Sequence, residues 1–141
     1  MDSSEHSCGQ SGPIPIAQIN PAVDRLAERS IRATVTLVWP YSSSTKSFSV
    51  LLAEPDVRLR RSNGQVKVTF HALVAERIAE TDVGIGDEVV LGLSGCRLEG
   101  NGTATQTPSR YVAWDVHFDN RVHIEVILEG MQKLLWVNYF C

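Results

Sequence analysis

An alternation of apolar and polar residues begins near residue 30 and predicts the first two β-strands. Residues 30–39, SIRATVTLVW, carry an apolar side chain at every second position from Ile31, so one face of this strand packs inward. The run ends at Pro40, which cannot donate to a central hydrogen-bond ladder. A polar loop over residues 41–45 then leads to the apolar run of residues 50–52, which predicts the second strand.

Residues 65–71 predict a third strand, because inward-facing apolar residues alternate there with polar ones. The Asn63-Gly64 pair just before it is a strong tight-turn signal. This turn either joins the strand to residues 58–61 as a hairpin or closes a longer loop.

The period of the pattern changes after the third strand. Residues 72–80 place apolar side chains at helical spacing and predict a short helix. A Gly-rich turn ends this helix, and residues 88–93 predict a fourth strand. A polar loop over residues 98–110 follows. Residues 111–118 and 122–127 alternate again and predict either two strands or one bent strand.

This order of elements predicts an all-β domain with one short helix over residues 30–128. It matches the five-stranded Greek-key barrel called the OB-fold, although other small barrels and sandwiches also accommodate it. In the OB-fold, strands two and three and the loops joining strands one to two and four to five contact oligomers.

The flanking segments have other compositions. Residues 1–15 are rich in Ser, Gly and Pro and predict a disordered leader. The Asn20-Pro21 pair favours a short helix or turn over residues 16–29. Residues 129–141 form an apolar tail, which exposes a sticky patch unless it covers the barrel or a second chain.

Composition and charge narrow the function. The chain has 141 residues, of which 43% are hydrophobic, which is enough for one domain with a single core. A net charge of −3 argues against binding nucleic acid by blanket phosphate neutralisation, so any such site is local. A basic cluster does lie between Lys46 and Lys67, and an acidic segment follows it.

The cysteines and the apolar runs indicate the compartment. The three cysteines are widely separated, which argues against a disulfide framework and favours a reducing compartment. The chain shows neither a signal peptide nor an apolar run long enough to span a membrane. We therefore expect a soluble intracellular protein without a membrane partner.

Residues 32–56, 58–61 and 84–89 carry a resemblance to a known family. They resemble the telomeric single-stranded-DNA-binding domain shared by protection-of-telomeres proteins and the related yeast end-capping protein, particularly the fungal members. The most distinctive part is the loop WPYSSSTK at residues 39–46 with its flanking strands. The resemblance implies an OB-fold that binds the single-stranded overhang at chromosome ends, in the nucleus and without catalysis.

Members of that family are usually much longer, and residues 130–141 match none of its motifs. A truncated or misspliced product is one interpretation of this difference. The partners that the resemblance implies are single-stranded telomeric DNA and other proteins of a telomere complex.

Single-strand binding needs aromatic faces on which bases stack and cations that follow the phosphates. Candidates of both kinds lie in the first loop, in the basic cluster, on the third strand and beside the long loop. The predicted nucleic-acid-binding residues are Tyr41, Thr45, Lys46, Phe48, Arg58, Arg60, Arg61, Lys67, Thr69, His71, Arg97 and Trp114.

Several candidates also have a purely structural explanation. Trp39 ends the inward-facing series of the first strand, which favours a core position over base stacking. Phe48 shares a face with Val50, so core packing and stacking both remain open. Tyr41, in a polar loop, is the best stacking candidate. The arginines of residues 58–61 form either a DNA-binding surface or a solvated face.

Two other interpretations of the same barrel remain open. The surface either holds protein partners in a telomere complex, with little DNA affinity, or binds single-stranded nucleic acid without sequence preference. His117 and His123 lack the spacing of a metal site, and no cofactor motif is present. The chain also shows no nucleophile elbow, phosphate loop or framed carboxylate pair, so we expect no enzyme activity.

Overall fold

The computed structural model describes residues 12–81, 83–102, 110–128 and 131–138 of the chain. The strands are β1 (Ser30–Ser42), β2 (Ser47–Ala53), β3 (Gln65–His71), β4 (Glu88–Gly92), β5 (Cys96–Gly100), β6 (Trp114–Phe118), β7 (Arg121–Leu128) and β8 (Met131–Asn138). The helices are α2 (Ala72–Ala79) and three short 3₁₀ helices, η1 (Ile16–Gln18), η2 (Leu26–Glu28) and η3 (Val57–Arg61).

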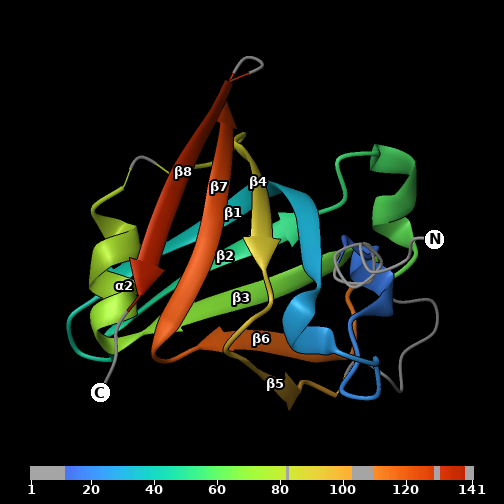
Figure 1. The fold of residues 1–141 in the computed structure, drawn as a ribbon, viewed down its shortest axis with the longest axis horizontal. Helices are drawn as coiled ribbons and strands as arrows, with labels where there is room; N and C mark the ends of the chain where they lie inside the picture. Colours follow the sequence, from blue (N-terminus) through green and yellow to red (C-terminus); the bar gives the residue numbers. More distant parts are fainter. Residues whose placement is uncertain (1–11, 82, 103–109, 129–130, 139–141) are drawn as a thin grey trace, which may run out of the picture.

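The strands form one sheet in the order β5-β6-β3-β2-β1-β4-β7-β8. Neighbouring strands are antiparallel, except that β3 and β6 run parallel. Figure 1 shows β4, β7 and β8 lying across β1, β2 and β3, so the sheet curls round on itself, and α2 lies at one end of the β1 to β3 layer. The described residues are thus mostly β with one α-helix, in a curled half-barrel consistent with an OB-like fold.

The described residues form eight strand segments where the sequence analysis predicted five strands. The predicted fourth strand continues past a turn at Gly95, whose φ of +82° suits glycine, and resumes as β5. Segments β6 and β7 are separated by Asp119 and Asn120. The tail adds β8, which pairs with β7 from Met131 to Asn138.

The core lies inside the curl. Phe70 of β3 stacks between Phe48 of β2, at 6.3 Å between ring centroids, and Phe118 of β6, at 5.7 Å. On α2, the buried side chains of Val74 and Ile78 share one face at helical spacing and join the same core. Fully burying one such side chain contributes about 1.5–3 kcal/mol, so this packing holds the strands in their curl.

A bulge in β1 reverses the inward face that the alternation predicted. Val35 pairs with Leu52, but Leu37 pairs with Leu51, so Thr36 is an extra residue in the ladder. Because side chains alternate with a period of two, one extra residue moves the following side chains to the other face. The expected core position of Trp39 is therefore wrong: its side chain faces outward and is 40% exposed, and Leu37 is 42% exposed.

Three further segments were considered in the sequence analysis. Of the two alternatives for residues 58–61, the hairpin is wrong and the longer loop between β2 and β3 is present: these residues belong to η3, because the Asp56 carboxylate accepts from the Arg58 N–H at 3.0 Å and caps a helical turn. The end of the predicted leader is ordered: the Ile14 N–H donates to the Ser30 carbonyl at 2.8 Å, whereas residues 1–11 lie outside the described part. Residues 16–29 contain η1 and η2.

Candidate nucleic-acid interface

A hollow of about 290 Å³ lies on the outer face of the sheet beside the β1 bulge. We call it the Trp39 hollow. Its lining is mostly apolar and consists of Leu37, Trp39, Leu51, Lys67, Asn101, Tyr111, Val112 and Asp115.

The register of β1, β2 and β3 places the residues that form the floor of the Trp39 hollow next to one another. Leu37 of β1 lies opposite Leu51 of β2, and Leu51 lies opposite Lys67 of β3, so three adjacent strands supply one row of outward side chains. The Lys67 ammonium nitrogen lies 4.7 Å from the centre of the Trp39 ring. A cation over an indole face contributes about 0.5–1 kcal/mol at an exposed site and orients both side chains.

Tyr111 and Val112 form one wall of the Trp39 hollow, and backbone hydrogen bonds attach residues 110–112 to Gln65 of β3. The Gln65 N–H donates to the Arg110 carbonyl at 3.1 Å, and the Val112 N–H donates to the Gln65 carbonyl at 3.0 Å. These bonds hold Tyr111, 41% exposed, beside the floor. The Asn101 amide donates to the Val112 carbonyl at 3.0 Å and to Asp115 Oδ1 at 2.9 Å, which joins the two sides of the wall.

A row of polar side chains extends from the hollow along the outer face of the sheet toward the C-terminal end of β3. Next to Trp39, the hydroxyls of Ser49 and Thr69 form a buried hydrogen bond of 2.8 Å. Beyond them, His71 Nε2 and His117 Nδ1 are 2.9 Å apart with the rings stacked, and Glu99 Oε1 lies 3.2 Å from His117 Nε2.

Two charge effects act on this polar end. Burial lowers the pKa of His71, and the nearby Asp119 carboxylate opposes this shift in part. Arg97 donates two hydrogen bonds to Asp119, at 2.9 and 3.2 Å, and thereby lowers the pKa of that carboxyl. The neutral His71 and the ionised Asp119 are therefore the favoured forms.

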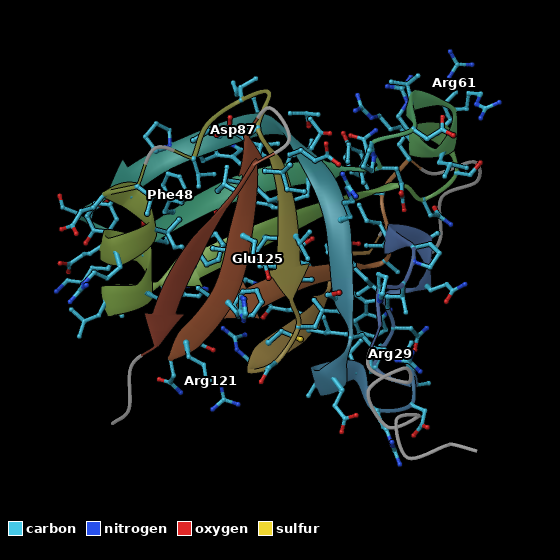
Figure 2. The ribbon with its side chains drawn as sticks, turned by 45° about the horizontal axis from the view of Figure 1, so that its top comes forward. Arg29, Phe48, Arg61, Asp87, Arg121 and Glu125 are labelled. Carbon is cyan, nitrogen blue, oxygen red and sulfur yellow. The ribbon has the colours of Figure 1, made fainter. Side chains whose placement is uncertain are left out.

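The structure separates the predicted cations. Lys67 lies in the Trp39 hollow, whereas Arg97 is held by Asp119. Arg58 pairs with Asp56 at 3.0 Å, and Arg60 donates to the Glu54 carbonyl at 2.7 Å. Figure 2 shows Arg61 at the η3 end of the molecule, remote from Phe48, which lies near α2.

The structure reverses the expected exposure of the aromatic residues: Trp39 is exposed on the surface, whereas Phe48 and Tyr41 pack against the core. Phe48 is only 6% exposed and packs on Phe70, so a surface stacking role is wrong for it. A second irregularity in β1, between Trp39 and Ser42, lets Tyr41 pack against the core. Trp114 lies on β6 one residue before Asp115, so alternation puts it on the face opposite the hollow.

The remaining predicted residues lie along the same strands. Thr45 and Lys46 are exposed in the turn between β1 and β2, where Lys46 has a φ of +54° and the Thr45 hydroxyl bonds Ser47 at 2.8 Å. Thr69 lies on the outer face of β3 between the hollow and the C-terminal end of the strand, and His71 lies on the same face at that end.

The sequence analysis did not identify six of the residues that line the hollow: Leu37, Leu51, Asn101, Tyr111, Val112 and Asp115. No residue type marks Thr36 as a bulge, and the approach of Tyr111 to β3 depends on a non-local backbone bridge. Within the described ranges, no group of three or more His, Cys, Asp or Glu side chains is placed to hold a metal ion. No helix in the same ranges is long and apolar enough to cross a membrane.

Comparison with a solved structure supports the class of fold. The chain is similar to the crystal structure of fission yeast Pot1 and single-stranded DNA, with a TM-score of 0.54 and 15% sequence identity. The match covers 84% of this chain and 40% of the Pot1 chain, so this chain spans well under half of that protein's length. At this identity the similarity shows an OB-like fold.

The sequence itself assigns the family. The chain belongs to the family described as a domain of unknown function (DUF8502), whose model matches residues 9–135. No curated protein matches the chain.

Proposed function

We propose that this protein is a five-stranded OB-fold barrel that binds single-stranded DNA on the outer face of β1, β2, β3 and β6. Counting β4 with β5 and β6 with β7 as two bent strands gives five long strands, with the helix between the third and the fourth, and β8 as an additional strand that pairs with β7. The antiparallel pairing of β1 with β4 and the parallel pairing of β3 with β6 then bring the first and third strands to the two bent ones. This is the arrangement that an OB-fold requires.

The Trp39 hollow is the observation that supports binding. It combines two exposed aromatic side chains, Trp39 and Tyr111, with the Lys67 ammonium, on the second- and third-strand face that OB-folds use for oligonucleotides. Bases stack on aromatic faces, and a cation beside them serves a phosphate. A base that stacks on Trp39 takes the place of the Lys67 ammonium, which then turns either to the edge of that base or to a neighbouring phosphate.

The finer proposal is telomeric single-stranded DNA in the nucleus, in a role without catalysis. It rests on the resemblance of residues 32–56 to telomere end-binding domains and on the similarity of the fold to fission yeast Pot1. Other proteins of a telomere complex are the proposed protein partners.

Fluorescence anisotropy of a labelled single strand tests the proposal. Trp39→Ala is expected to weaken binding about 5- to 150-fold, which corresponds to the loss of one stacked base at about 1–3 kcal/mol. The matched control is Leu73→Ala, which trims a side chain that is 51% exposed on α2. Circular dichroism of both variants checks that the fold is retained.

Competition with unlabelled strands and a salt series distinguish telomeric binding from sequence-tolerant binding and from a protein-interaction role. A G-rich telomeric strand should outcompete a scrambled strand and duplex DNA, and the salt slope should be shallow because few cations face the hollow. Equal competition by the scrambled strand would indicate sequence-tolerant binding. Absence of binding by the folded chain would leave the protein-interaction module as the function of this surface.

A further inference from the structure

The Trp39 hollow carries two opposite charges that the stacking role does not use together. Lys67 and Asp115 both line it, around a floor that includes Leu37 and Leu51. Val68 and Val116 pair in the parallel register of β3 and β6, so the residues before them, Lys67 and Asp115, lie on neighbouring strands. A donor and an acceptor therefore border one apolar, base-sized space.

The Asp115 carboxylate is held in position. Asn101 donates to its Oδ1 at 2.9 Å, and the same amide nitrogen is tied to the Val112 carbonyl at 3.0 Å. An ionised carboxylate accepts only, and its two oxygens offer about four lone-pair directions, so one bond from Asn101 leaves capacity for a ligand. A negative charge repels phosphates, so the ligand groups that this carboxylate can bind favourably are the N–H donors of a base.

We propose that the Trp39 hollow is a guanine-selective subsite in which Asp115 accepts from the base and Lys67 donates to it. This inference rests on the proposed single-strand function. Guanine carries two adjacent donors, N1–H and N2–H₂, which match the two oxygens of one carboxylate. Its O6 and N7 are acceptors that lysine contacts in other protein–DNA complexes.

The other bases fit this pair of charges less well. Adenine and cytosine present an amino donor next to a ring-nitrogen lone pair, which faces the second carboxylate oxygen and repels it. Thymine presents one N–H between two carbonyl oxygens. Leaving a buried acceptor against a lone pair removes the benefit of the contact and adds a desolvation cost. Stacking on Trp39 favours none of the four strongly, so the selectivity comes from Asp115.

The experiment measures the affinity of the full chain for labelled dT12 strands with one central position changed to dG, dA, dC or deoxyinosine. Unmodified dT12 reports single-strand binding itself. The dG strand should bind about 5- to 150-fold more tightly than dT12, the range of a good two-point base contact. Deoxyinosine lacks the N2 amino group and should lose much of that gain.

Two variants test whether the Asp115 carboxylate causes the preference for dG. Asp115→Asn should lose the preference for dG over dT12, because the amide presents a donor to one of the two guanine donors; the ratio of the two affinities in the same variant is the measured quantity. Glu99→Gln is the matched control: it neutralises the carboxylate that lies opposite Asp115 in the β5–β6 register, 3.2 Å from His117 and not part of the hollow's lining, and should keep the preference.

The outcomes separate the two proposals. Binding of dT12 with equal affinity for all central bases would overturn the guanine subsite and leave the single-strand function standing. A wild-type preference for dG that deoxyinosine retains in full would also overturn it, because the N2 amino group would then have no role. Failure to bind any strand would overturn both. The deoxyinosine comparison uses wild-type protein, so it stands even if Asp115→Asn does not fold.

Discussion

His71 of β3 and His117 of β6 share one hydrogen bond of 2.9 Å between Nε2 and Nδ1, with their ring centroids 5.1 Å apart. One of the two nitrogens must donate and the other must accept, so the bond is lost when both rings are doubly protonated. The pair joins the parallel strands on the outer face, at the opposite end of β3 from the Trp39 hollow. It makes the stability of this face dependent on pH.

The free energy of unfolding should therefore fall as the pH falls. Burial lowers the pKa of folded His71, so between that pKa and the ordinary value of about 6.5 the unfolded chain binds more protons than the folded chain. The destabilisation is absent above the ordinary value and complete below the folded pKa. Urea unfolding at pH 7.5 and at pH 5.5 measures it, and His71→Gln should reduce the difference. An unchanged difference in His71→Gln would show that His71 is not its source.

Truncation of Phe48 should destabilise the fold rather than act on a binding surface. The ring is 6% exposed and stacks on Phe70, so Phe48→Ala leaves a cavity and is expected to cost about 3–5 kcal/mol in urea unfolding. Leu73→Ala, on the exposed side of α2, should change stability by less than about 0.5 kcal/mol. Equal small effects of the two substitutions would contradict the placement of Phe48 in the core.

The Ser49–Thr69 hydroxyl pair should show strong coupling. Both residues are buried and their hydroxyls are 2.8 Å apart, so Thr69→Val alone leaves the Ser49 hydroxyl without this partner and should cost about 1–3 kcal/mol. Combining Ser49→Ala with Thr69→Val removes both polar groups and should be closer to neutral. A double-mutant cycle by urea unfolding measures the coupling, and simple additivity would argue against the bond.

Gly64 should not tolerate a side chain. A Cβ at this position would lie 2.1 Å from the Leu59 carbonyl oxygen, which is backbone and cannot rotate away. Gly64→Ala is therefore expected to destabilise the chain by about 1–3 kcal/mol or more in thermal or urea unfolding. In the control Gly92→Ala the nearest atoms are 3.6 Å away, an ordinary contact, so a comparable loss there would point to a general effect of glycine replacement.

The sequence by itself determined where most strands lie and which positions of β3 face inward. Val66, Val68 and Phe70 are buried as their alternation predicted, and the helical period of residues 72–80 became α2. These features are local: they depend on the spacing of apolar residues along one segment, which the chain carries wherever that segment packs.

Only the tertiary structure decided which aromatic side chains face outward. Thr36 is an extra residue solely in relation to β2, so the bulge that turns Trp39 outward exists only once the two strands are paired. Tyr111 joins Trp39 through a bridge to Gln65, far away in the sequence. Contacts of this kind have no periodic signature, because they arise from the register between segments and not from the order of residues within one.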